Sequence, residues 1–259
     1  MSEAYIVAAT RTAGGRKGGQ LSGWHPADLA AQVIDELVRR TRADPARVDD
    51  VIMGCVSQIG EQSTNIARNA VLASGLPETV PATSVDRQCG SSQQAIHFAA
   101  QAVMSGTMDV VIASGVESMS RVPIGTPMDL PQKAGLGFYK SPGMEARYPE
   151  VFFSQFTGAE EIARKWELGR EAMDEFSFQS HLKARAATEA GRFDAEIIAV
   201  EKRLHDGAVP GDMATRDEGI RYDVSLEAVS QVRLLTEGGR LTAASASQIC
   251  DGAAGVMVV

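Results

Sequence analysis

The first 120 residues of the sequence predict an α/β layered domain, in which helices cover a β-sheet. Short β-branched runs alternate there with segments whose apolar residues recur at helical spacing. The strand-like runs are apolar throughout, as expected for strands that are buried on both faces. Of the 259 residues, 44% are hydrophobic and 22% are charged, which is an ordinary globular composition with enough apolar residues for a substantial core. We therefore expect one layered domain in this part of the chain.

The expected elements alternate regularly up to residue 85. Runs of Val, Ile and small residues predict strands, and amphipathic spacing predicts helices, the first of which follows Pro26. In chain order, these are strand 5–9, helix 28–40, strand 51–56, helix 65–73 and strand 80–85.

The next strand-to-helix junction contains a single cysteine, Cys89. After it, Gly and Ser residues lead into apolar residues at helical spacing, and a strand follows at 109–115. We expect Cys89 in the first turn of the helix, where unpaired N–H groups and the helix dipole favour a thiolate nucleophile. A buried structural thiol is the common alternative. The small residues Gly90, Ser91 and Ser92 favour the nucleophile, because they leave room for a substrate above the sulfur.

The second half of the chain has a different pattern. Residues 126–150 carry four prolines and lack sustained periodicity, so we expect a long functional loop there. Helices are expected at 159–166 and 170–190, and a strand at 196–200. Residues 241–259 are rich in small residues, then become apolar and stop within a strand-like run.

Charge and cysteine content exclude several classes of protein. The net charge of −8 argues against nucleic-acid binding. No apolar run is long enough to span a membrane, and the N-terminus does not resemble a signal peptide, so we expect a cytoplasmic protein without membrane contact. The cysteines (Cys55, Cys89 and Cys250) are few and widely spaced, which predicts neither a disulfide framework nor a metal site. Cys55 lies in a strand-like run, where core packing is its expected role.

A cysteine nucleophile normally requires a base, usually histidine. His97 lies on the same helix as Cys89, but eight residues place it roughly 12 Å further along the axis. We expect His25, His181 and His205 to be surface or capping residues. The sequence therefore contains no convincing base for Cys89.

Three further features are weaker signals. Residues 14–19 (GGRKGG) lack the Gly-Lys-Ser/Thr ending of a phosphate-binding loop, so a flexible surface loop is the better interpretation. Arg216 and Arg221 are candidates for phosphate contacts, although exposed arginines are usually solvated. Glu117 follows a strand on the same side as Cys89, and either supports the site or caps a helix.

Several segments together resemble the thiolase family (acetyl-CoA acetyltransferases and 3-ketoacyl-CoA thiolases), with most similarity to degradative thiolases of actinobacteria. The segments occur in the family's order and spacing over the whole chain. They are residues 9–12 (ATRT), 85–92 (VDRQCGSS), 115–120 (GVESMS) and 245–254 (SASQICDGAA). Most members have Asn and Gly where this chain has Asp86 and Ser92.

The resemblance implies a CoA-dependent acyltransferase. Cys89 would attack a 3-ketoacyl-CoA, carry the acyl group as a thioester and pass it to a second CoA, and its backbone N–H would contribute to an oxyanion hole. By the same resemblance, Arg221 would contact the CoA nucleotide and Ser247 the pantetheine. CoA would be a substrate, with no permanently bound cofactor and no metal, and the protein would form a homodimer or homotetramer.

The resemblance also implies a domain arrangement. Residues 1–118 would form the N-terminal α/β domain, 119–243 a loop domain that covers CoA and mediates oligomerisation, and 244–259 a returning strand. This is one half of the α-β-α-β-α thiolase architecture. The other half supplies Asn-Glu-Ala-Phe, Gly-His-Pro and Cys-x-Gly motifs, which do not occur in these 259 residues. We therefore expect the sequence to be the N-terminal part of a longer protein.

Two alternatives remain open from the sequence. One is a related enzyme on the same fold, of the ketoacyl synthase or hydroxymethylglutaryl-CoA synthase type. The other is a non-catalytic thiolase-like subunit that binds acyl-CoA or lipid.

Overall fold

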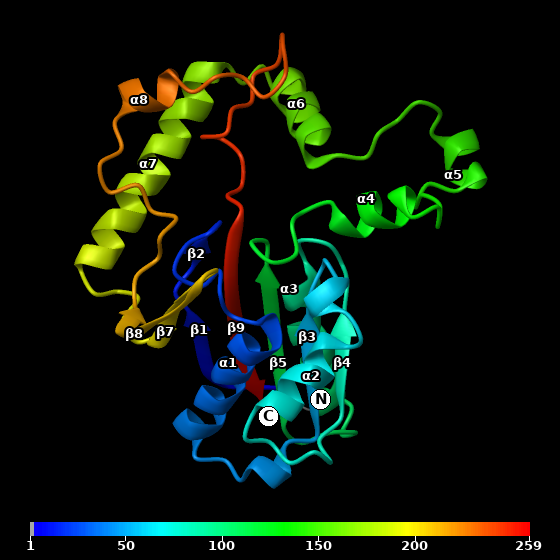
Figure 1. Cartoon of the computed structure of the whole chain (residues 1–259), viewed down its shortest axis with the longest axis vertical. Helices are drawn as coiled ribbons and strands as arrows, with labels where there is room; N and C mark the ends of the chain where they lie inside the picture. The colour runs from blue at the N-terminus through cyan, green and yellow to red at the C-terminus, as the bar shows by residue number, and fades with distance from the viewer. Residues whose placement is uncertain (1–2) are drawn as a thin grey trace. The chain divides into compact units, whose positions relative to one another are not determined.

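A computed structural model describes residues 3–259 and divides them into two compact units (Figure 1). The first unit contains the chain up to Asp129 together with Phe193–Gly219 and Ile249–Val259. The second contains Leu130–Arg192 and Ile220–Gln248. Residues 193–219 thus return to the first unit, within the segment that we expected to form the loop domain.

Within the described residues, the first unit is built on a seven-stranded mixed sheet. The strand order is β4-β3-β5-β9-β1-β6, and β2 pairs with β9. Strands β3, β4 and β5 run parallel, whereas β9 is antiparallel to both β5 and β1. The strands are β1 (Ile6–Thr12), β2 (Gly15–Arg16), β3 (Asp50–Gly54), β4 (Ala82–Val85), β5 (Val111–Ser118), β6 (Ile197–Ile198) and β9 (Cys250–Val258).

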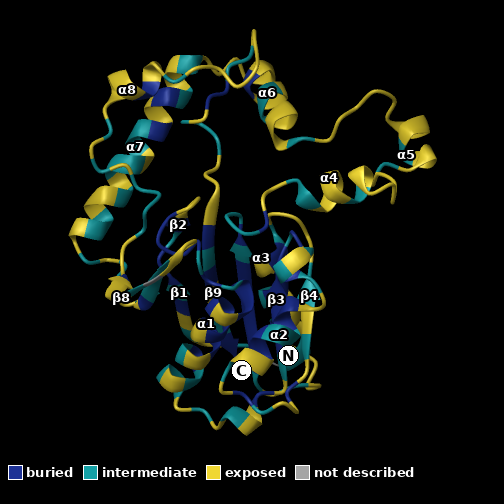
Figure 2. Cartoon of the chain, viewed as in Figure 1, coloured by how far each residue is buried: buried dark blue, intermediate teal, exposed yellow. Residues whose placement is uncertain are grey.

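Helices cover both faces of this sheet, as the predicted α/β layered fold requires. Successive strand residues point to opposite faces, so Val51 and Met53 belong to one apolar cluster while Ile52 belongs to the other. The first cluster includes the buried faces of α1 (Pro26–Thr41) and α2 (Ile66–Ala73), and the second includes α3 (Ser91–Met104). Burial in the molecule is concentrated in this sheet and its helices (Figure 2).

A hairpin of β7 (Val200–Leu204) and β8 (Gly207–Ala214) also belongs to the first unit. Arg11 of β1 holds the ends of this returning segment, because its guanidinium lies 2.7 Å from carboxylate oxygens of both Glu196 and Asp217. Arg203 of β7 connects the hairpin to the segment before α1, because its guanidinium stacks 3.6 Å from the ring centroid of Trp24.

The second unit is mainly helical. It contains α5 (Pro142–Arg147), α6 (Gln155–Lys165), α7 (Arg170–Glu189) and α8 (Leu226–Ser230), and α4 (Thr126–Lys133) crosses the boundary between the units. Arg170 joins α7 to the end of α8: its Nε lies 2.6 Å from Asp174, and its Nη2 donates to the carbonyl of Val232 at 2.6 Å.

The sequence predicted most elements up to residue 190 to within a few residues, but it did not predict β2, β8 or α8, and two later expectations differ from the structure. Residues 126–150 are not a continuous loop, because α4 and α5 form there. The strand expected at 196–200 is two short strands, β6 and β7, which pair with different partners. No helix among the described residues is long and apolar enough to cross a membrane.

Candidate functional site

The candidate site lies where the three parallel strands end. Because β3, β4 and β5 run in the same direction, the residues that follow them emerge at the same edge of the sheet. These are the segment after Gly54, the turn that contains Cys89, and the end of β5 at Glu117 and Ser118. The amide of Cys55 donates to the carbonyl of Val85 at 3.1 Å, which joins the first two of these segments.

Cys89 lies in a tight turn between β4 and α3. Asp86 Oδ1 accepts the N–H of Gln88 at 2.8 Å, and the N–H groups of Gly90 and Ser91 donate to the carbonyls of Arg87 and Gln88. Gln88 has a left-handed backbone (φ 48°), which is costly for a residue with a side chain. None of these turn bonds uses the N–H of Cys89, and its side chain is exposed.

The expected position of Cys89 in the first helical turn is wrong. Gly90 is the N-cap, and α3 begins at Ser91. The first hydrogen bond of the helix runs from the N–H of Gln94 to the carbonyl of Gly90. Cys89 therefore lies one residue before the N-cap, in the turn that leads into the helix.

The small residues after Cys89 have a packing role that the sequence reasoning missed. A β-carbon on Gly54 would lie 2.3 Å from the backbone nitrogen of Ser92. A β-carbon on Gly115 would lie 1.8 Å from the Oγ of Ser92. The start of α3 therefore rests directly on β3 and β5. Ser91 Oγ accepts the N–H of Arg87 at 2.9 Å and fixes the turn from within.

Glu117 caps no helix, but organises the segment that follows β3. Its two carboxylate oxygens accept the N–H groups of Val56 at 2.8 Å and Ser57 at 3.2 Å. The buried Gln62 side chain donates to the same carboxylate at 2.8 Å. Burial, together with the nearby carboxylates of Glu117 and Asp86, raises the pKa of the Cys55 thiol. Cys55 is buried, as predicted for a core cysteine.

A buried carboxylate, Asp251, ties the start of β9 to the end of β5. It is 1% exposed and accepts the Ser118 hydroxyl at 3.1 Å, the Ser120 N–H at 2.8 Å and the Ser120 hydroxyl at 2.6 Å. Ser120 Oγ in turn accepts the N–H of Gly18 at 2.8 Å. Sequence reasoning did not identify Asp251, since an isolated Asp in a small-residue run carries no distinguishing signal.

In the glycine-rich loop (residues 14–19) and just after it, backbone N–H groups donate to carboxylates from a later part of the chain. The N–H of Gly14 donates to Asp217 at 2.7 Å, and those of Arg16 and Gln20 donate to Glu218 at 3.0 and 2.9 Å. Residues 16–18 are exposed, as expected for a surface loop, and two acidic residues about 200 positions later hold the backbone of the loop. Burial opposes ionisation of Asp217, but its bonds from Arg11 and Gly14 outweigh this and lower its pKa.

The histidines occupy separate structural positions. His25 is the N-cap of α1, where Nδ1 accepts the N–H of Ala27 at 3.3 Å, as its position before a helix predicted. His97 lies within α3, and His205 lies in the turn between β7 and β8.

Arg221 and Ser247 belong to the second unit, and both side chains are exposed. The Arg221 backbone is anchored to α7, because its N–H donates to Nδ1 of His181 at 3.2 Å. Arg185, also on α7, donates to the neighbouring carbonyl of Tyr222 at 2.8 Å. Burial and the Arg221 charge lower the pKa of His181.

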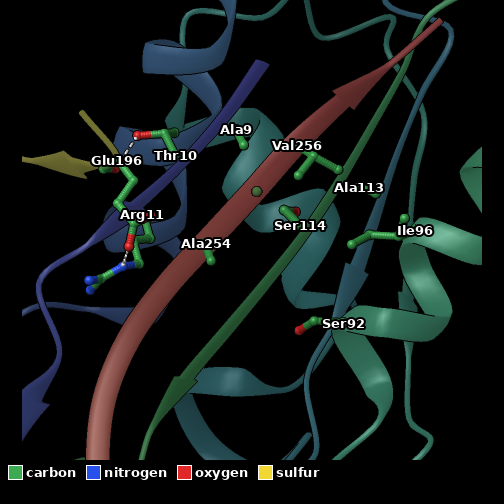
Figure 3. A pocket seen from close by; sticks show the side chains of 11 residues that line it. Ala9, Thr10, Arg11, Ser92, Ile96, Ala113, Ser114, Glu196, Ala254 and Val256 are labelled. Atoms are coloured by element: carbon green, nitrogen blue, oxygen red, sulfur yellow. Dashed lines mark hydrogen bonds and ion pairs between the residues drawn. The ribbon is translucent and has the colours of Figure 1, made fainter. Parts of the chain in front are cut away.

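A largely apolar hollow of about 240 Å³ lies on the α3 side of the sheet (Figure 3). Ser92 and Ile96 of α3 line it together with residues of β1, β5 and β9, and Arg11 with Glu196 stands at its far side. Cys89 is not among its lining residues. Among residues 3–259, His, Cys, Asp and Glu side chains form no cluster that could hold a metal ion.

Comparison with known proteins agrees with the motifs at this edge of the sheet. Residues 4–259 match the family described as thiolase, N-terminal domain. The chain is 51% identical to the steroid 3-ketoacyl-CoA thiolase FadA6 of Mycobacterium tuberculosis, over 100% of this chain and 62% of the relative. It is 39% identical to a 3-ketoacyl-CoA thiolase of Pseudoalteromonas translucida (100% and 64%) and 40% identical to one of Saccharophagus degradans (98% and 63%). The chain thus spans less than two thirds of the length of these relatives. It belongs to the thiolase family and corresponds to the family's N-terminal domain.

Proposed function

We propose that the chain is the acyl-carrying part of a thiolase, with Cys89 as the nucleophile. The proposal rests on one observation above the others. In a chain of the thiolase family, the exposed Cys89 lies in a turn that backbone hydrogen bonds hold in place, at the edge where three parallel strands end. Ligands of such sheets bind at this edge.

The reaction has two steps. The Cys89 thiolate adds to the 3-keto carbon of a 3-ketoacyl-CoA, and the bond between carbons 2 and 3 then breaks. Acetyl-CoA leaves as its enolate and takes up a proton, while the acyl group remains on sulfur as a thioester. The thiol of a second CoA loses its proton and attacks the thioester, which releases the shortened acyl-CoA and the Cys89 thiolate. The N–H of Cys89 is assigned to the oxyanion hole, since the turn bonds leave it out.

No histidine in residues 3–259 is hydrogen-bonded to Cys89. We assign the proton transfers to the histidine and second cysteine of the thiolase C-terminal half, which the family resemblance implies.

We assign CoA binding to Arg221 and Ser247. The anchored backbone and exposed guanidinium of Arg221 suit contact with a nucleotide phosphate. Arg221→Ala is expected to raise the KM for CoA about tenfold with little change in kcat. Arg164→Ala, which removes an exposed arginine from α6 in the same unit, serves as the control. Ser247→Ala is expected to raise the KM for CoA by a smaller factor.

The decisive experiment uses the protein at its natural length. It is incubated with short-chain, long-chain and ring-bearing 3-ketoacyl-CoAs, and the peptide that contains Cys89 is examined by mass spectrometry for a bound acyl group. Acylation at Cys89, absent from Cys89→Ala, supports the proposal. The ring-bearing substrate tests whether this chain shares the steroid specificity named for FadA6.

Binding of acyl-CoA without acylation or thiolysis would overturn the enzymatic proposal, and would favour a non-catalytic binding subunit. Light scattering of the same sample tests the proposed homodimer or homotetramer.

A further inference from the structure

Glu117 is linked to the Cys89 turn by a series of backbone hydrogen bonds. It is the penultimate residue of β5, and its oxygens accept the N–H groups of Val56 and Ser57. These two residues directly follow Cys55. The N–H of Cys55 is bonded to the carbonyl of Val85, the last residue of β4.

The segment after β3 needs such an acceptor. A strand that ends leaves its next N–H groups without ladder partners, and unpaired buried N–H groups are costly. One carboxylate satisfies two consecutive N–H groups, and Gln62 holds it in place. The Gln62 amide donates to Glu117 and to the carbonyl of Ser57, while its own oxygen accepts the N–H of Ser118 at 2.7 Å.

The turn of Cys89 is also held from the side of β3. The backbone of Ser92 lies against Gly54, which directly precedes Cys55. The last residue of β3 and the residue after it thus meet both sides of the Cys89 turn: Cys55 donates to the carbonyl of Val85 before the turn, and Gly54 lies against Ser92 after it. A shift of residues 54–57 therefore moves both ends of the turn.

We propose that Glu117 is a positioning residue for the nucleophile: by holding the segment after β3, it fixes the turn that presents Cys89. This inference rests on the proposed function of Cys89 and adds to it a residue that need not touch the substrate. Misplacement of a reacting group by about 1 Å is sufficient to reduce turnover by about 100-fold.

The test compares two carboxylates that each accept two consecutive N–H groups, at opposite ends of β3 and β5. Glu117→Gln keeps the shape of the side chain, but turns one acceptor into a donor that faces an N–H group. The matched control is Asp49→Asn. Asp49 precedes β3 and accepts the N–H groups of Asp109 at 2.6 Å and Val110 at 2.9 Å, just before β5. Glu117→Asp, which keeps the charge and shortens the reach, is a milder second variant.

Amide hydrogen exchange is measured on the peptide that spans residues 86–92. We expect exchange there to be at least about tenfold faster in Glu117→Gln and intermediate in Glu117→Asp, with no change in Asp49→Asn. In thiolysis assays of the natural-length protein, Glu117→Gln is expected to lower kcat about 10- to 100-fold, while its KM for CoA stays within about twofold of the unmodified protein.

Two results would overturn the proposal. One is unchanged exchange of residues 86–92 in both Glu117 variants, and the other is an equal increase in Asp49→Asn. Because hydrogen exchange requires no CoA chemistry, this outcome is separate from failure of the proposed function, which the absence of Cys89 acylation in the unmodified protein would reveal.

Discussion

The Oγ of Ser92 on α3 lies 1.8 Å from the position that a β-carbon on Gly115 of β5 would occupy. Helix and strand therefore meet without space for a single methyl group. This contact sets the height of α3 above the sheet, and with it the place where the preceding turn leaves the surface.

Gly115→Ala is expected to destabilise the first unit by about 2–3 kcal/mol, because the new methyl group overpacks this contact. In these 259 residues, a Trp166→Phe background leaves Trp24 as the one tryptophan, which then serves as a fluorescence reporter for the first unit during urea unfolding. The second substitution Ser92→Gly removes the obstructing side chain and should restore part of the loss. Gly252→Ala on β9, also in the first unit, is the control, because its new β-carbon would make only an ordinary contact, 3.5 Å from Thr12 Oγ1. Equal midpoints for Gly115→Ala and the parent would contradict the close approach.

The three cysteines are expected to react with iodoacetamide in a fixed order. Cys89 is exposed and should be alkylated first. Cys250 is exposed as well, but it should react more slowly, because partial desolvation and the carboxylates of Asp251 and Glu117 raise its pKa and reduce its thiolate fraction. Cys55 is buried and should react only after unfolding. Peptide mapping over time measures this order, and similar rates at all three sites would refute it.

At acidic pH, protonation of Glu36 on α1 should lower the free energy of unfolding. Hydrogen bonds from Arg39 and Arg40 outweigh partial burial and lower the pKa of Glu36 from 4.5 to about 2. Because the pKa is lower in the folded state, this stabilisation is complete above about pH 4.5 and is lost as the pH falls toward 2. Its size is about 1–2 kcal/mol, limited by the 73% exposure of the Arg39 side chain.

Glu36→Gln should therefore flatten the decline in stability between about pH 4.5 and 2, as measured by urea unfolding at a series of pH values. Glu78→Gln, at an exposed position after α2, is the comparison. Parallel acid profiles for Glu36→Gln and the parent protein would show that these ion pairs contribute nothing.

Asp251→Asn should cost at least about 2 kcal/mol, because it removes the charge that strengthens three hydrogen bonds in a buried site and replaces the oxygen that accepts the Ser120 hydroxyl with a donor. The Trp24 reporter measures the loss. Asp212→Asn, which removes an exposed ion pair with Lys202, should change stability by no more than about 0.5 kcal/mol. A loss for Asp251→Asn as small as that of the control would mean that the network does not hold β9 in place.

Local patterns predicted the elements whose residues repeat at a regular spacing. Helix α1 and strand β3 were found because apolar residues recur at the period of each structure. Helix α4 was missed because it contains Pro131, a residue that usually ends a helix. The exact start of α3 was also missed, since the left-handed Gln88 gives no sign in the sequence.

The sequence by itself determined the layered α/β class, the family resemblance and the identity of Cys89 as the candidate nucleophile, because each depends on residues that are close together in the chain. Tertiary structure decided what those residues contact. Glu117 meets Val56 across 61 positions, and Asp217 meets Gly14 across 203. Such bonds form only when the sheet brings distant strand ends together, and a single sequence does not record which polar group will satisfy which N–H.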